Sequence, residues 1–137
     1  MTVAGIRERF ALRNRTLAAA FAGQIPDRGG AVVALTSDAT TGNVPYGASK
    51  GALDRIVISA ACGLGPKNIS ASVLNPGPID TGWMNDAIRN ELVRKQPSGR
   101  LGQPADIAGV VAFLVSEEGR WKSGQLLNAD GGFSARF

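Results

Sequence analysis

The chain has 137 residues, of which 44% are hydrophobic and 19% are charged, and its net charge is +4. This length and composition suit one globular domain with a hydrophobic core and exclude an intrinsically disordered chain. The single cysteine excludes an internal disulfide, and the absence of histidine excludes a Ser-His-Asp triad and the usual zinc sites.

Neither a membrane segment nor a nucleic-acid site is expected. No apolar run approaches the roughly 18 residues that span a bilayer, and the N-terminus lacks the apolar core of a secretory signal. We therefore predict a cytoplasmic protein. Arginines gather near the start of the chain, but no aromatic platform accompanies them, so a solvated helix face is favoured over nucleic-acid binding.

The first half of the chain reads as helix, strand and helix. Apolar residues recur at helical spacing over residues 4–23, and Gly23 and Pro26 end that pattern. The short apolar run 31–35 is typical of a strand buried on both faces. After a polar loop, a helix rich in small residues is predicted over 44–64.

The second half alternates in the same way. A partly alternating strand over 69–74 leads into the rigid turn 75–78, Asn-Pro-Gly-Pro. Helices are predicted over 84–95 and 104–115, and a third strand over 125–128. Alternating helices and strands of this kind predict an α/β fold with a parallel sheet covered by helices on both faces.

The stretch from Ser37 to Lys50 carries the chemistry. Tyr46 and Lys50 are four residues apart at the start of a predicted helix, so they lie one turn apart on one face. An ammonium beside a phenol favours the phenolate, which lets a tyrosine act as a general acid or base. Ser37 then offers a hydrogen bond to a substrate oxygen; Thr36 competes for this role, and we favour Ser37.

Four stretches in this order resemble the short-chain dehydrogenase/reductase family, with a likeness to 3-oxoacyl carrier-protein reductases. The strand ending in Thr36-Ser37 resembles the family's catalytic-serine strand, and residues 46–50 resemble its Tyr-x-x-x-Lys helix. Residues 75–81 resemble the Pro-Gly turn after its sixth strand. The C-terminal signature is matched by the segments 99–108, 123–125 and 130–132.

The resemblance implies an enzyme that interconverts a carbonyl and an alcohol on a small-molecule substrate with NAD or NADP. Tyr46 would pass the proton, Lys50 would hold the nicotinamide ribose hydroxyls, and Ser37 would hydrogen-bond the carbonyl. Asn14 is the nearest candidate for the family's helix asparagine, displaced by about one residue, or about 100° around a helix.

The resemblance also implies a cofactor-binding segment after the second predicted strand. Pro76, Gly77 and Pro78 would line the nicotinamide, and the Ile79 backbone would reach its carboxamide. Thr81 would reach the carboxamide or the phosphates, cap the helix that follows, or do both. Ligands of open α/β sheets bind outside the carboxyl ends of the strands, where this segment lies.

The front of the family's domain has no counterpart in residues 1–137. No Gly-rich turn follows a first strand, and the residue that selects NAD or NADP is missing. The chain therefore resembles the second half of a Rossmann-type doubly wound sheet, a single partial domain of three parallel strands with flanking helices. Such a half leaves a sheet edge unpaired.

Two consequences of this partial domain are expected. We expect a homo-oligomer, either a dimer or a tetramer. A non-catalytic half-domain that oligomerises or binds a partner chain remains the alternative to an enzyme.

Four other residues have predicted structural roles. Cys62 is expected to be packed, and Trp121 to pack in the C-terminal loop. Trp83 either lines the substrate side or anchors the short helix, and Asp130 with the two glycines after it shapes a turn.

Overall fold

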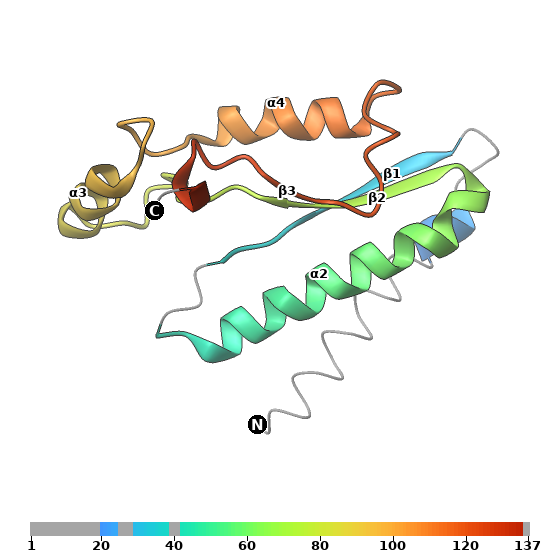
Figure 1. Ribbon diagram of the computed structural model, residues 1–137, viewed down its shortest axis with the longest axis horizontal. Coiled ribbons are helices and arrows are strands. Elements are labelled where there is room, and N and C mark those ends of the chain that lie inside the picture. Colours follow the sequence, from blue (N-terminus) through green and yellow to red (C-terminus); the bar gives the residue numbers. More distant parts are fainter. Residues whose placement is uncertain (1–19, 25–28, 39–41, 136–137) are drawn as a thin grey trace.

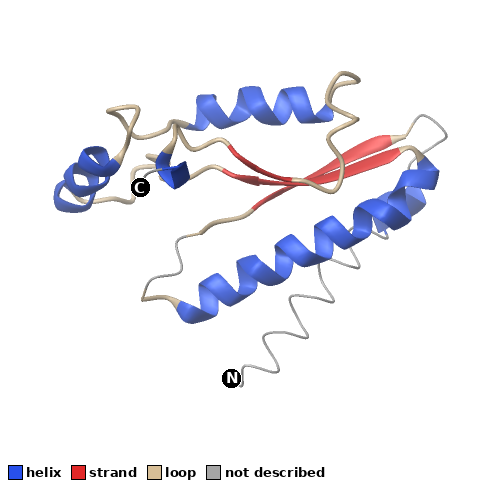
Figure 2. Ribbon diagram, viewed as in Figure 1, coloured by secondary structure: helices blue, strands red, loops and turns tan. Residues whose placement is uncertain are grey.

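The computed structural model describes residues 20–24, 29–38 and 42–135. Within them, one parallel sheet has the strand order β1-β2-β3 (Figure 2). Its strands are β1 (Gly30–Leu35), β2 (Ile69–Asn75) and β3 (Leu126–Asn128). The predicted α/β fold and parallel sheet are confirmed. The predicted helix over 4–23 lies mostly outside the described residues, of which 20–24 are helical.

Helices cover both faces of the sheet, as predicted. Figure 1 shows α2 (Val44–Leu64) along one face and α4 (Pro104–Val115) along the other. The shorter α3 (Asp86–Lys95) lies beyond the carboxyl ends of the strands. Two 3-10 turns complete the described elements, η1 (Gly65–Lys67) and η2 (Phe133–Ala135). No helix of the described segments is long and apolar enough to cross a membrane.

Local signals fix both ends of α2, whose predicted bounds are confirmed. The Asn43 side chain accepts a hydrogen bond from the Tyr46 amide at 3.3 Å, and Pro45 occupies the first turn. Past Leu64 the chain tightens into η1 and then turns at Asn68, whose φ of 56° is left-handed. The start of α2 therefore lies at the end of the sheet where the strands finish (Figure 1).

The helix after the Pro-Gly turn begins later than predicted. Its first residue is Asp86, and the Asn85 side chain accepts a hydrogen bond from the Ile88 amide at 2.9 Å. Asn85 is therefore the cap, and the predicted capping role of Thr81 is wrong. Asn and Thr both make good caps, so sequence alone did not separate them.

The core lies between α2 and β2. Leu53, Val57 and Leu64 of α2 pack on Ile69 and Val73 of β2, and every residue of β2 is buried. Because β1 is at the sheet edge, it is only half-buried, and Leu35 is 47% exposed. The prediction that residues 31–35 are buried on both faces is therefore wrong, and the central β2 has that role.

Three further side chains lie outside the core. Cys62 and Trp121 are exposed, the latter with 97% of its surface in solvent, so their predicted packing is wrong. Trp83 is 68% exposed, too much for a buried anchor of α3. No element of the described segments buries any of the three side chains.

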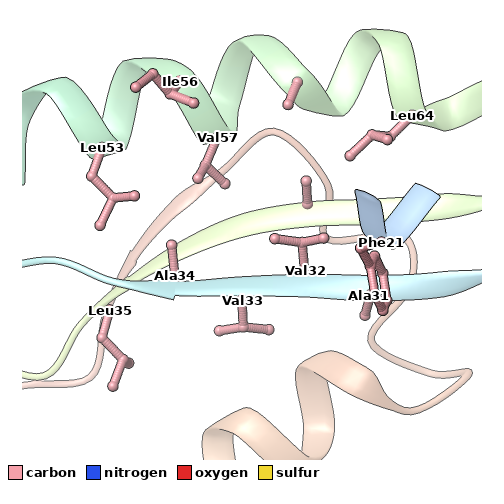
Figure 3. Close-up of a pocket in the computed structure, with 12 residues that line it drawn as sticks. Phe21, Ala31, Val32, Val33, Ala34, Leu35, Leu53, Ile56, Val57 and Leu64 are labelled. Carbon is pink, nitrogen blue, oxygen red and sulfur yellow. The ribbon is translucent and has the colours of Figure 1, made fainter. Parts of the chain in front are cut away.

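An apolar groove of about 540 Å³ runs between β1 and α2 (Figure 3). In Figure 3, Val32 and Ala34 point towards α2, while Val33 and Leu35 point to the opposite face of the sheet. The groove is lined from end to end by hydrophobic side chains, namely Phe21, Ala31, Val32, Val33, Ala34, Leu35, Leu53, Ile56, Val57, Ala60, Leu64 and Ala71. An apolar surface of this kind marks a face that another element normally covers.

Candidate active site

Tyr46 and Lys50 lie together at the start of α2. Tyr46 sits in the first turn and is 40% exposed, and Lys50 follows one turn later. The Lys50 Nζ atom is 5.6 Å from the centroid of the Tyr46 ring, within the range of a cation–π contact. The side chains that the spacing placed on one helical face therefore do meet.

Lys50 also joins α2 to the end of β1. Its Nζ donates a hydrogen bond to the Leu35 carbonyl oxygen at 2.9 Å, two residues before Ser37. The next residue, Thr36, still belongs to the sheet ladder, because its amide donates to the Leu74 carbonyl at 2.9 Å. Ser37 thus follows a fixed strand end, two residues after the carbonyl that Lys50 contacts.

The two candidate hydroxyls differ in burial. Thr36 is 5% exposed, and its Oγ1 atom is buried with no hydrogen-bond partner. Ser37 is half-buried. The more accessible Ser37 is the better placed of the two to meet a small molecule, in line with the preference drawn from the sequence.

The Pro-Gly turn is held by the C-terminal turn, 53 residues later. The Gly77 amide donates to the Asn75 side chain at 3.2 Å, and Gly77 has a left-handed φ of 64°. A Cβ atom added at Gly77 would lie 2.5 Å from the Cβ atom of Asp130. Only glycine therefore lets these two turns approach so closely.

Asp130 is itself fixed by a network of hydrogen bonds. Its carboxylate accepts from the amides of Gly132 at 3.0 Å and Ser134 at 2.9 Å. Burial raises the pKa of Asp130, but these hydrogen bonds outweigh it and the net pKa is lowered. The Gln96 side chain donates to the Asp130 carbonyl at 2.6 Å. The predicted turn at Asp130 is confirmed, and it supports the Pro-Gly turn.

The C-terminal signature holds the residues on either side of Ile79 and leaves the N–H and C=O of Ile79 out of these hydrogen bonds. The Gly102 amide donates to the Pro78 carbonyl at 3.1 Å, and the Asp80 amide donates to the Gly102 carbonyl at 2.9 Å. In such a parallel bridge, the N–H and C=O of the middle residue point away from the partner. The Ile79 backbone groups therefore face away from Gly102.

A bidentate ion pair stabilises that signature segment. Arg100 donates to both carboxylate oxygens of Asp106, at 2.7 and 2.9 Å, and the Gln103 amide donates to the same carboxylate at 2.8 Å. The hydrogen bonds from Arg100 and Gln103 lower the pKa of Asp106 to about 2. The motif thus fixes the start of α4 and, through Gly102, the position of Ile79.

Two predicted site residues, Thr81 and Asn14, remain to be placed. Thr81 is exposed, and Asp80 beside it pairs with Arg89. Asn14 lies outside the described residues.

A cavity of about 370 Å³ opens beside Ser37, at the carboxyl ends of the strands. Its walls come from all three strand ends and from α2, and they comprise Thr36, Ser37, Asp38, Gly47, Gly51, Asp54, Asn75, Leu126 and Asn128. Sequence reasoning missed Asp54, although it follows Lys50 by one turn of the same helix. It also missed Gln96, whose partner is 34 residues away.

Comparison with known proteins identifies the family of this chain. A family model described as enoyl-(acyl carrier protein) reductase matches residues 11–134. The chain belongs to the short-chain dehydrogenase/reductase family. Two relatives within this family are an uncharacterized oxidoreductase, YjdA, of Bacillus subtilis and the 7alpha-hydroxysteroid dehydrogenase of Escherichia coli K12. The first is 42% identical over 108 residues and the second 38% over 112 residues.

Solved short-chain dehydrogenase/reductase structures share the fold as well. The angucycline C-6 ketoreductase LanV with bound NADP superposes with a TM-score of 0.74 at 36% identity, over 81% of this chain. A blue fluorescent protein from a metagenomic library, in complex with NADPH, gives 0.72 at 37% identity, over 82% of this chain. The Rossmann-type α/β fold predicted for this chain is thereby confirmed.

The chain spans about half the length of the relatives it matches. The alignments cover 76% of this chain for both relatives, but only 43% of YjdA and 44% of the steroid dehydrogenase. They cover 46% of LanV and 48% of the blue fluorescent protein. The match therefore covers less than half of each of these proteins.

Proposed function

We propose that this chain forms the proton-handling half of an NAD(P)-dependent oxidoreductase that interconverts a carbonyl and an alcohol on a small molecule. The observation that carries the proposal is the placement of Lys50. Its ammonium lies 5.6 Å from the Tyr46 ring centroid and 2.9 Å from the Leu35 carbonyl oxygen, close to Ser37. Proton donor, cation and hydroxyl are thus gathered at one end of the sheet.

Each group has a distinct task in this proposal. Tyr46 gives its proton to the carbonyl oxygen during reduction and takes it back during oxidation. Ser37 donates a hydrogen bond to the same oxygen, which stabilises the negative charge that develops there. The Lys50 ammonium stabilises the phenolate of Tyr46 between the two steps.

The cofactor is proposed to be NADP or NAD, at the Pro-Gly turn. When bound, it supplies or accepts the hydride at the carbonyl carbon. The residues present fit a nicotinamide: the left-handed Gly77 leaves no side chain on the turn, and the Ile79 N–H and C=O face away from Gly102. Pro76 and Pro78 would line the ring, Thr81 would reach the carboxamide or phosphates, and Lys50 the ribose hydroxyls. The NADP of LanV and the NADPH of the blue fluorescent protein support this assignment by analogy.

Residues 1–137 are proposed to be one partial domain whose dinucleotide-binding half comes from outside this segment. Among the described residues, no strand pairs with the outer edge of β1, which supports this. The amides of Gly30 and Thr36 donate to the β2 side, so the odd-numbered residues between them direct their backbone groups outward. Ala31 and Val33 offer these groups to a further strand, next to the apolar groove.

A binding measurement tests the cofactor assignment. Trp83 is exposed and follows Gly77 of the Pro-Gly turn by six residues, so nicotinamide binding at that turn is expected to quench its emission. Saturable quenching by NADPH, abolished in a Trp83→Phe variant but retained by Trp121→Phe, supports the proposal. Quenching that depends on Trp121 would place the ligand elsewhere and contradict it.

A second candidate function is a non-catalytic half-domain that oligomerises or binds a partner chain. The apolar groove between β1 and α2 favours it. A defined oligomer by light scattering, with no NADPH binding even after the missing half is supplied, would favour this candidate. The dimer or tetramer and the cytoplasmic location stay predictions under either function.

A further inference from the structure

The cavity beside Ser37 contains a buried hydroxyl that nothing in the described chain satisfies. Thr36 is 5% exposed, lines this cavity, and has no partner for its Oγ1 atom. Val32 and Ala34 point towards α2, and strand alternation places the Thr36 side chain on the same side (Figure 3). A buried hydroxyl without a hydrogen bond is costly, so this position is suited to meet a ligand or water.

Asp54 lines the same cavity from the helix, and one of its carboxylate oxygens is buried. The Oδ1 atom of Asp54 is inaccessible to solvent and has no hydrogen-bond partner. Asp54 shares a helical stripe with Gly47 and Gly51, because the three are spaced by four and three residues. An added Cβ at Gly51 would meet no atom within 4 Å, so the space beside Gly51 is open.

The charged side chains in the cavity wall are all acidic. Two aspartates, Asp38 and Asp54, lie in its wall, and no lysine or arginine lines it among the described residues. Asn75, the remaining buried polar residue of the wall, already accepts a hydrogen bond from the Gly77 amide. A hydrogen-bond donor, above all a cationic one, would therefore satisfy this wall best.

We propose that this cavity binds the polar end of the substrate, with Asp54 and Thr36 selecting a hydrogen-bond-donating group and preferring an ammonium group over a hydroxyl. Asp54 accepts a charge-assisted hydrogen bond from that group, and the Thr36 hydroxyl adds a second contact. The inference rests on the proposed function, since Ser37 in the same wall addresses the reacting oxygen. It narrows the substrate to amino- or hydroxy-carbonyl compounds and the matching alcohols.

Ligand binding to the 137-residue chain tests this without cofactor or turnover. Cyclohexylamine, cyclohexanol and cyclohexanone are titrated in turn, and backbone amide shifts are followed by NMR. The amine is expected to bind most tightly and the ketone least, with the largest shifts at Gly47, Gly51 and Asn75. Equal affinities, or shifts that map elsewhere, would overturn the proposal.

Two variants sharpen the test. Asp54→Asn keeps the shape of the side chain and is expected to weaken amine binding by about 10-fold or more, since a charged hydrogen bond becomes a neutral one. Thr36→Val is expected to weaken binding of both the amine and cyclohexanol, and it carries the test should Asp54→Asn not fold. Asp86→Asn, an exposed charge change on α3, is the matched control and should leave binding unaltered.

The binding assay separates this inference from the proposed function, because it measures neither turnover nor cofactor binding. Unchanged amine binding in Asp54→Asn would refute the role of Asp54, whatever turnover is found.

Discussion

The Lys50 ammonium donates a hydrogen bond to the Leu35 carbonyl oxygen at 2.9 Å, across the gap between α2 and the outer edge of β1. This contact ties the helix that carries Tyr46 to the strand that carries Ser37. The backbone of Leu35 faces the edge of the sheet that no strand of the described segments pairs, where a neighbouring strand is proposed to lie. Lys50 therefore holds α2 against β1 through the Leu35 carbonyl, and the same ammonium is proposed to stabilise the Tyr46 phenolate.

Removal of the hydrogen bond from Lys50 to the Leu35 carbonyl should destabilise the fold around the site. Lys50→Met is expected to lower the free energy of unfolding by about 1 kcal/mol, because a hydrogen bond from a charged donor is lost. Chemical denaturation measures the difference. Lys122→Met, at an exposed position on the far end of the sheet, is the control and should have little effect. Equal stability of the Lys50→Met and parent chains would contradict a structural role for the tie.

Gly77→Ala should destabilise the Pro-Gly turn by at least about 1 kcal/mol, since alanine is disfavoured at positive φ. The contact adds to this, because the new Cβ would lie 2.5 Å from the Asp130 Cβ. Gly63→Ala, inside α2 with no atom within 4 Å of the new Cβ, should instead stabilise the chain by about 0.5–1 kcal/mol. Denaturation curves of the two variants should therefore shift in opposite directions.

A proline scan of β1 tests its open edge. Val33→Pro removes an N–H that points outward, whereas Val32→Pro removes one that points to β2. We expect Val33→Pro to fold and to self-associate less, and Val32→Pro to unfold. Light scattering and circular dichroism report the two outcomes. Equal damage from both substitutions would show that the outward side of β1 is already paired.

Acid should loosen the start of α4. The folded-state pKa of Asp106 is lowered to about 2, below the ordinary value of 3.8, so its carboxylate favours the folded state at neutral pH. That contribution is present above about pH 4 and is lost as the pH falls towards 2. Asp106→Asn should lower the melting temperature at pH 7 but make little difference at pH 2. A gap between the two proteins that persists at pH 2 would contradict this role of the charge.

Local signals in the sequence were enough for the framework of the fold. Pro45 at one end, with Gly65 and Pro66 at the other, indicated the bounds of α2, because helix starts and helix breaking depend on near neighbours. The capping role of Asn43 was seen only in the structure. The parallel sheet followed from the alternation of elements. The meeting of Tyr46 and Lys50 followed from helical spacing alone.

Burial and distant contacts were not predictable in this way. The run 31–35 was expected to be buried on both faces, but β2 takes the centre of the sheet and leaves β1 at its edge. The predicted burial of Cys62 and Trp121 was wrong for the same reason, since the exposure of a side chain depends on which elements cover it. The contact of Gly77 with Asp130 joins residues 53 positions apart, and no local pattern encodes it.

The central claim is that Tyr46 transfers the proton in a carbonyl reduction. The most direct measurement uses a chimera in which the N-terminal half of LanV precedes this chain, with NADPH consumption followed over a panel of amino- and hydroxy-ketones. The parent chimera should turn over, and Tyr46→Phe should lower kcat by about 100-fold or more, with NADPH binding retained. A Tyr46→Phe chimera that reduces the same ketones at the parent rate would contradict the claim.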